Sequence, residues 1–348
     1  MTVGKNLNIE LMRIISMFLI VSGHVIGHYA PSITNGSSAL HTDIPRLLIF
    51  LSFHVNLFVL ISGYCGIRRI QSIWKTWKLI FSYLLLIALM NLVFSWGSFD
   101  YSSLLLPLSR NPWWFMHIYV LLALLAPTML EPLLATVNHH QLSVLACVLI
   151  VIDVYFGFFC HMETVHYSGF NLIHFITIYI IGSCLRTLDV RHLSLKGHTL
   201  KAHHFLLMFA LGMVLKVLYH FGTEGLGLND MCNDYNHPFN IALAVCLFLS
   251  CINMNVRDTR ILFVSNSVIG VYLLHEHPLI REWLIKEFDI LAGLCKSNIP
   301  MELLLVLSYA SAIFITAILI DKVRLQLLKS VECGIAWGLD KVKFHSGG

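Results

Sequence analysis

The chain has 348 residues, of which 57% are hydrophobic and 12% are charged, and this charged share is about half that of a typical soluble domain. A water-soluble fold of this size needs more polar surface, so the composition excludes soluble enzymes, nucleic-acid-binding proteins and disordered chains. The formal net charge of +4 is too small to imply a polyanionic partner by itself. The apolar stretches have the length of membrane-crossing helices and lack the alternation of an outer-membrane barrel. We therefore expect an all-α, polytopic membrane protein.

Ten apolar segments along the chain predict ten transmembrane helices. Their approximate bounds are 7–30, 44–66, 77–97, 113–136, 142–160, 168–187, 203–221, 237–253, 265–286 and 301–321. Residues 1–321 are expected to form one transmembrane domain, and residues 322–348 a short amphipathic tail on the cytoplasmic side.

The distribution of lysine and arginine predicts the orientation of these helices, because both residues accumulate on the cytoplasmic side of a membrane. With the N-terminus inside, seventeen of them fall in inner segments and five in outer segments. The outer five are Arg46, Arg110, Arg281, Lys286 and Lys296. Both termini are therefore expected to be cytoplasmic. Cys160, Cys232 and Cys295 fall on the outer side, and the sequence leaves open whether a disulfide forms there.

The first segment carries four polar residues on one face of an otherwise apolar helix. At about 100° per residue, Arg13 and His24 lie within about 20° of the same direction, and Glu10 and His28 within about 40° of it. Arg13 and His24 are about 16 Å apart along the helix axis. Glu10 and Arg13 have the i, i+3 spacing that lets side chains meet. Ionisable groups in a membrane usually mark a path or a site; the alternative is a packing stripe with a snorkelling arginine and hydrogen-bonded histidines.

Basic residues and histidines are distributed asymmetrically across the predicted membrane. The inner ends of the second and third segments carry Arg68, Arg69, Lys75 and Lys78, and the outer halves carry His54, His174, His220, His275 and His277. Arginine and lysine commonly bind phosphates, and an imidazole can remove a hydroxyl proton near neutral pH. This layout favours transfer of an acyl group from a cytoplasmic polyanionic donor to a hydroxyl on the far side.

A proton- or metal-coupled transporter is the alternative interpretation of the histidines. His24 and His28, spaced i and i+4, can share a metal ion, and His275-Glu276-His277 adds further donors. Acidic ligands are sparse within the apolar segments, however, and the sequence shows no inverted repeat of the kind common in transporters.

Four motifs occur in order along the chain. They are Arg13 and His24 separated by ten residues, Phe53-His54 leading to Ser62-Gly63-Tyr64, Pro112-Trp113-Trp114-Phe115 followed by Tyr119 and Pro127, and Val271-Tyr272-Leu273-Leu274-His275. From about residue 5 to 320 the chain thus resembles the integral-membrane acyltransferase family 3, whose members acylate hydroxyls of surface polysaccharides, peptidoglycan or other extracytoplasmic acceptors. One departure is Lys75-Thr76-Trp77-Lys78, where the family often has Arg-x-x-Arg; lysine keeps the charge but loses the bidentate geometry.

The resemblance implies an acyl-CoA donor, most often acetyl-CoA, and a glycan or lipid-linked sugar acceptor, with no permanently bound cofactor and no metal. His24 is expected to act as general base on the acceptor hydroxyl or to carry the acyl group itself, and Arg13 is expected to be the second catalytic residue. The residues expected to hold the donor phosphates are Arg13, Arg68, Arg69, Lys75 and Lys78. The residues expected to contact substrate are His54, Ser62, Trp113, Trp114, Tyr119 and His275.

Several of these roles have structural alternatives that the sequence leaves open. Trp113, Trp114 and Tyr119 either stack on an acceptor sugar or belong to an interfacial aromatic belt. Ser62 either lies near the thioester or contributes to a small-residue helix contact, and His275 either polarises the acceptor or orients His24. The resemblance implies a multi-pass protein of the bacterial inner membrane, surrounded by lipid. Whether it forms a homo-oligomer is left open.

Overall fold

The computed structural model describes residues 6–29, 50–108, 113–162, 165, 167–188, 190, 192–195, 198–226, 231–294 and 299–345. Five residues named above lie outside these ranges, namely Arg46, Arg110, Pro112, Cys295 and Lys296. The second predicted segment is described only from residue 50. Of the outer cysteines, Cys160 is exposed and Cys232 is buried.

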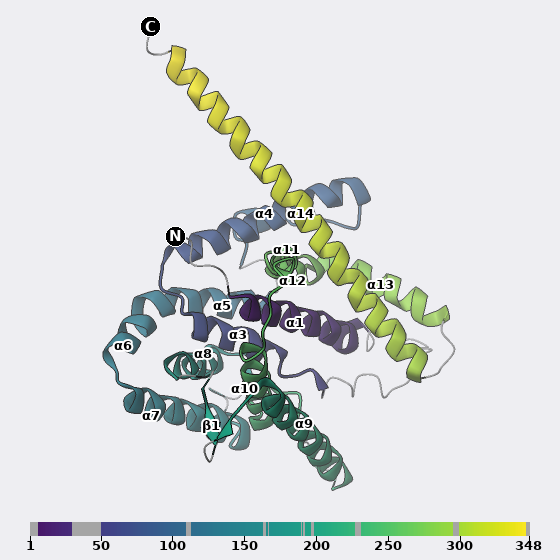
Figure 1. The fold of residues 1–348 in the computed structure, drawn as a ribbon. Helices are drawn as coiled ribbons and strands as arrows, with labels where there is room; N and C mark the ends of the chain where they lie inside the picture. Colours follow the sequence, from purple (N-terminus) through teal and green to yellow (C-terminus); the bar gives the residue numbers. More distant parts are fainter. Residues whose placement is uncertain are drawn as a thin grey trace.

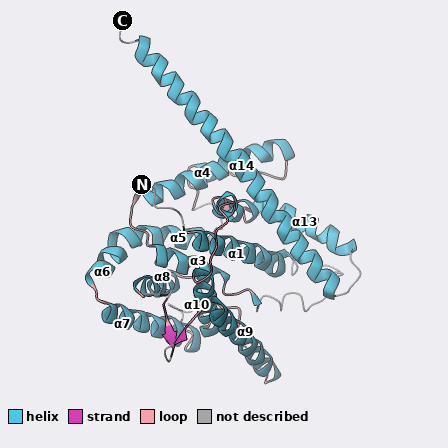
Figure 2. Cartoon of the chain, viewed as in Figure 1, coloured by secondary structure: helices cyan, strands magenta, loops and turns pink. Residues whose placement is uncertain are grey.

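The described chain consists almost entirely of helices (Figures 1 and 2). They are α1 (Leu7–His24), α3 (His54–Cys65), α4 (Gln71–Phe94), α5 (Trp114–Leu125), α6 (Glu131–Thr136), α7 (His139–Ile150), α8 (Leu172–Thr187), α9 (Ala202–Gly225), α10 (Pro238–Ile252), α11 (Ile261–Ser265), α12 (Val268–His275), α13 (Pro278–Leu294) and α14 (Ile299–His345). Turns of π-helix extend α1 over Val25–Tyr29, join α5 to α6 over Ala126–Leu130 and extend α7 over Val151–Phe159. Short 3-10 turns cover Tyr101–Leu104 and Tyr167–Gly169. Two strands, β1 (Ser194–Leu195) and β2 (His198–Thr199), pair as an antiparallel hairpin. The helical fold class is therefore confirmed.

The apolar helices correspond to the predicted segments, but they differ in length. Six are long and apolar enough to cross a membrane within the described residues. They are Leu7–His28, Ile73–Phe94, Trp114–Thr136, His139–Phe159, Ala202–Gly225 and Pro300–Lys329. Four shorter apolar helices are His54–Cys65, Leu172–Thr187, Pro238–Ile252 and Ile261–His275. Each predicted segment overlaps at least one helix, whereas the number of ten crossings and the orientation of the termini stay predictions.

The short helix α3 forms the centre of the bundle, because α1, α8 and α10 all pack against it. Residues from His54 to Gly63 are buried. Its contact with α8 is close enough that a Cβ atom on Gly63 would lie 2.1 Å from the carbonyl oxygen of Tyr179, and one on Gly182 would lie 2.3 Å from that of Leu60. Gly63 thus contributes a small-residue helix contact, and the two interpretations of Ser62 stay open.

Helix α14 runs unbroken across the bundle and past α4 toward the C-terminus (Figure 1). The tail predicted from residue 322 is therefore a continuation of the last apolar helix. Buried Asp321 accepts hydrogen bonds from the Tyr83 hydroxyl of α4 and from Arg324 Nε, and Arg324 Nη2 lies 2.7 Å from the same carboxylate. These polar contacts fix α14 against α4.

The segment predicted as one span over 265–286 is interrupted, which corrects the sequence analysis. Helix α12 ends at His275, and α13 begins at Pro278. Proline has no backbone N–H and favours the first position of a helix, so a new helix starts there and the preceding one stops. The break leaves Glu276 and His277 outside both helices, and both are buried.

Candidate functional site

The polar face of α1 has different partners at its two ends. Arg13 Nη1 donates to Glu10 Oε1 at 2.8 Å, which confirms the predicted i, i+3 contact. Glu10 is buried, whereas the Arg13 side chain is 33% exposed. At the other end His24 is the last residue of α1, and its ring centroid lies 5.2 Å from that of His28. The stripe thus divides into an ion pair and a histidine end.

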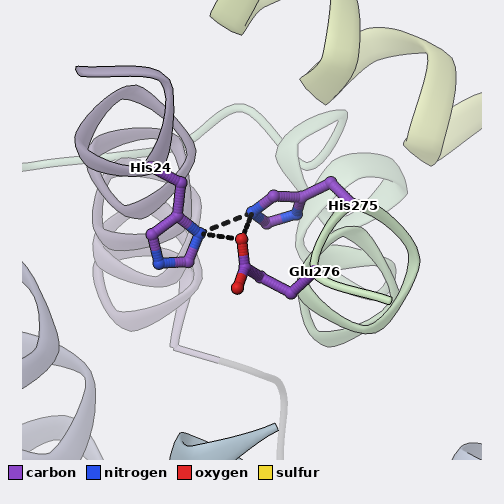
Figure 3. A group of neighbouring side chains, drawn as sticks. All are labelled: His24, His275 and Glu276. Atoms are coloured by element: carbon purple, nitrogen blue, oxygen red, sulfur yellow. Dashed lines mark hydrogen bonds and ion pairs between the residues drawn. The ribbon is translucent and has the colours of Figure 1, made fainter. Parts of the chain in front are cut away.

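Two residues from the far end of the chain meet His24 in a buried group that we call the His24 cluster (Figure 3). His24 Nδ1 lies 2.8 Å from His275 Nε2 and 3.0 Å from Glu276 Oε1. His24 and His275 are 251 positions apart in the sequence. Of the two roles predicted for His275, its contact with the ring of His24 favours the orienting one.

The hydrogen bonds of the cluster determine which ring nitrogens carry hydrogen. His275 Nδ1 lies 2.6 Å from the carbonyl oxygen of Val271, and because a carbonyl only accepts, this nitrogen is the donor. In neutral His275 the other nitrogen, Nε2, is then an acceptor for the hydrogen on His24 Nδ1. Neutral His24 therefore keeps its lone pair on Nε2, which makes that nitrogen available as a general base.

Glu276 is the cluster residue that the sequence analysis did not assign to catalysis. Its Oε1 faces His24, and its Oε2 lies 3.6 Å from Nη1 of Arg281. A carboxylate beside an imidazole stabilises the imidazolium that forms when the ring takes up a proton. The sequence analysis had named Glu276 only as a metal donor between His275 and His277.

The same cluster is the group of described residues that can hold a metal ion. One donor atom from each of His24, His275 and Glu276 lies within 4.8 Å of the others, and two imidazoles with a carboxylate are a common zinc ligand set. The hydrogen bond from His275 to the Val271 carbonyl matches the support that metal-bound histidines usually have. The donor set therefore fits Zn²⁺, although the sequence analysis expected no metal.

A cavity of about 250 Å³ lies beside the end of α1 that carries Arg13, and Ser62 and Tyr119 line it together with Arg13. The Tyr119 hydroxyl lies 3.4 Å from Ser62 Oγ. Buried Ser265 also lines the cavity, and its hydroxyl has no partner among the described residues. The sequence analysis left open whether Tyr119 stacks on an acceptor sugar or belongs to an interfacial belt. It lines this cavity together with Arg13, which the sequence analysis assigned to the donor, and its contact with an acceptor stays a prediction.

A wider cavity of about 800 Å³ lies between the end of α3 and the start of α4, and Arg68, Arg69 and Lys75 line it. Three of the residues predicted to hold phosphates are thus brought together. Exposed Lys78 lies further along α4 and is not among the lining residues. Arg68 also faces Glu131, with 3.7 Å between Nε and Oε2.

The other residues predicted to contact the acceptor do not join the His24 cluster directly. Trp113 is fully buried, and its ring meets that of His277 edge to face at 5.8 Å. Trp114 stacks on Tyr235 at 5.7 Å, and buried His54 lies 5.8 Å from the same tyrosine ring. Contact between these residues and an acceptor stays a prediction.

A second buried histidine pairs with a carboxylate, but its geometry is different. His174 Nδ1 lies 2.7 Å from Asp153 Oδ2, and its Nε2 lies 2.8 Å from Asn56 Oδ1. The Asn56 amide nitrogen donates to the carbonyl oxygen of Tyr235, which orients the amide oxygen toward His174. Both ring nitrogens have partners, so this histidine connects α8 to α3.

Comparison with known proteins identifies one family. A family model described as an acyltransferase domain matches residues 6–322, a range that contains both cavities and the whole His24 cluster. No curated protein and no solved structure matches the chain.

Proposed function

Because the chain belongs to this acyltransferase family over residues 6–322, we propose that it transfers an acyl group, preferably acetyl, from cytoplasmic acyl-CoA to a hydroxyl of an extracytoplasmic glycan or glycolipid. Its apolar helices make it a membrane protein. We assign it to the bacterial inner membrane, with ten crossings and both termini in the cytoplasm.

The observation that carries this proposal is the hydrogen bonding of His24. Its Nδ1 hydrogen-bonds His275 Nε2 and lies 3.0 Å from Glu276 Oε1, so Nε2 holds the lone pair. An imidazole held through its opposite ring nitrogen, with a carboxylate beside it, resembles the arrangement that serine hydrolases use to remove a hydroxyl proton. We therefore favour the general-base role of His24 over the acyl-carrier role.

In the proposed reaction His24 Nε2 removes the proton of the acceptor hydroxyl while the hydroxyl oxygen attacks the thioester carbonyl carbon. A carbon–oxygen bond forms and the carbon–sulfur bond breaks. The sulfur of CoA leaves as a thiolate and takes the proton from the His24 imidazolium, which returns the ring to its neutral form. Between these events Glu276 stabilises the imidazolium.

The donor enters from the basic end of the bundle. The nucleotide phosphates are held by Arg68, Arg69 and Lys75, with Lys78 adding positive charge nearby. The acyl-pantetheine arm then follows α1 through the cavity of Arg13, Ser62 and Tyr119. An extended arm spans the distance of about 16 Å from Arg13 to His24.

Thiol release from acetyl-CoA by purified protein in nanodiscs tests the proposal, with a crude surface-glycan extract as acceptor. Turnover is expected only with both the extract and an intact His24, so His24→Ala abolishes it. His203→Ala serves as the matched control, because His203 is exposed and lies on the peripheral helix α9. Full turnover by His24→Ala rules out the mechanism.

Metal-coupled transport is the second candidate, because the His24 cluster is also a metal donor set. Isothermal titration with CoA and with Zn²⁺ discriminates the two functions. An acyltransferase binds CoA, whereas a protein that binds Zn²⁺ through His24 and neither binds CoA nor releases thiol favours transport.

A further inference from the structure

A second cavity borders the His24 cluster from the side of α4, α13 and α14. This groove has a volume of about 710 Å³, within the range of small-molecule binding sites. Its lining is mainly apolar and includes Met90 of α4, Leu284 of α13 and Ala312 of α14. We call it the apolar groove.

The apolar groove reaches the candidate site at the end of α12. Leu274 and His275 are part of its lining, and His275 is the residue whose Nε2 contacts His24. The groove is therefore continuous with the wall of the His24 cluster. Arg13 and Ser62 line a separate cavity, whose lining contains no residue of the cluster, so the apolar groove is not the path proposed for the donor.

Aromatic residues surround the groove at the C-terminal end of α4, away from the cavity that Arg68, Arg69 and Lys75 line. The rings of Trp96 and Trp283 stack at 5.6 Å, and Phe94 stacks on Trp96 at 5.1 Å. Both tryptophans and Phe94 line the groove. Tryptophan is enriched where a membrane protein meets the lipid–water interface, so this position suits a molecule with an apolar chain and a polar head.

We propose that the apolar groove binds the lipid chain of a lipid-linked saccharide, and that this lipid-linked form is the acceptor of acyl transfer. Because lipid tails are as apolar as the groove itself, the groove contributes position more than affinity, and holds the start of the chain beside His275. The hydroxyl-bearing head then lies at the cluster. This inference rests on the proposed acyl transfer.

Acceptor preference provides the first test. The organic-phase extract of bacterial membranes supplies lipid-linked saccharides, and mild acid treatment of the same extract supplies the released saccharides without lipid. In nanodiscs with acetyl-CoA, we expect transfer to the intact extract to be at least tenfold faster. Equal rates for the two acceptors overturn the inference while leaving the acyltransferase function intact.

Two neighbouring residues of α14 supply matched variants. Thr316 lines the groove, whereas Ile315 is 57% exposed and does not. Thr316→Trp fills the groove and is expected to lower transfer to the intact extract at least tenfold. Ile315→Trp adds the same ring on the lipid-facing side and is expected to leave transfer unchanged. Equal effects of the two variants contradict a role for the groove.

Photo-crosslinking tests the groove without any turnover. A synthetic lipid-linked monosaccharide with a diazirine in its lipid chain is irradiated with the protein in nanodiscs, and labelled peptides are identified by mass spectrometry. Helix α9 serves as the lipid-facing reference, because its span is only 11% buried. We expect more labelling of α13 and α14 than of α9, and we expect this excess to disappear in Thr316→Trp. Uniform labelling overturns the inference, whereas groove labelling without thiol release overturns acyl transfer and leaves lipid binding.

Discussion

Glu276 lies one residue beyond the end of α12, and its Oε1 is 3.0 Å from Nδ1 of His24 on α1. Glu276 keeps helical backbone angles, and its N–H donates to the carbonyl oxygen of Tyr272 at 3.2 Å, so α12 sets the direction of its side chain. The packing of α12 against α1 therefore brings this carboxylate to the proposed base.

Removing the charge of Glu276 is expected to slow chemistry without weakening donor binding. Glu276→Gln keeps the size of the side chain but no longer stabilises the His24 imidazolium, so kcat falls by about 10²–10⁴-fold. The KM for acetyl-CoA stays near the wild-type value. Glu282→Gln, an exposed change on α13, is the control, and a wild-type kcat in Glu276→Gln contradicts the oriented-base mechanism.

Arg13 is expected to act mainly on the donor. Arg13→Ala removes a charge-assisted interaction of about 1.5–3 kcal/mol, which corresponds to a rise in KM for acetyl-CoA of about 10- to 100-fold, with kcat changed by only a few fold. Steady-state kinetics measures both constants. Arg257→Ala is the control, because Arg257 is exposed and lies in a loop. A fall in kcat at unchanged KM assigns Arg13 to the chemical step instead.

The cavity lined by Arg68, Arg69 and Lys75 predicts that binding of the donor depends on its nucleotide phosphates. Arg69→Ala and Lys75→Ala remove cavity-lining cations and are expected to weaken CoA binding about tenfold each. Neither affects S-acetyl-pantetheine, which lacks the nucleotide phosphates. Lys78→Ala, outside the lining, should have a smaller effect in the same titration, and an equal effect of all three variants indicates a diffuse electrostatic attraction.

The contact between α3 and α8 predicts a stability difference between two glycines. Gly63→Ala brings a methyl group against the Tyr179 carbonyl and is expected to destabilise the fold by about 1–3 kcal/mol. A Cβ atom added at Gly222 of α9 would meet nothing within 4 Å beyond its own helix backbone, so Gly222→Ala is neutral or stabilising by up to about 1 kcal/mol. Thermal unfolding in detergent measures the Tm of both variants and of the wild type. An unchanged Tm in Gly63→Ala contradicts the close packing.

Local features of the site were predictable, and long-range ones were not. The i, i+3 spacing of Glu10 and Arg13 follows from helix geometry, and the structure contains that ion pair. The role of Tyr119 was not predictable, because its distance from Ser62 depends on how α5 packs against α3. Sequence periodicity describes one helix at a time and contains no information on which helices become neighbours.

The His24 cluster illustrates the same limit. His275 was a candidate because of its residue type and depth, but its contact with His24 arises from a crossing of α1 and α12. Glu276 was hidden within a segment that hydropathy joins into a single span from 265 to 286. Hydropathy averages over the local break at Pro278 and contains no information on the packing of α12 against α1, which brings the carboxylate to His24.

Helix α14 lines both the apolar groove and the cavity of Arg13. Ala312 and Thr316 line the apolar groove, and Asp321, little more than one turn further on, lines the cavity of Arg13. Because the helix is unbroken between them, a rotation or axial shift of α14 at one cavity would also move its residues at the other. If the two cavities hold donor and acceptor as proposed, occupancy of one is therefore expected to affect binding at the other, against the restraint of the contacts of Asp321 with Tyr83 and Arg324.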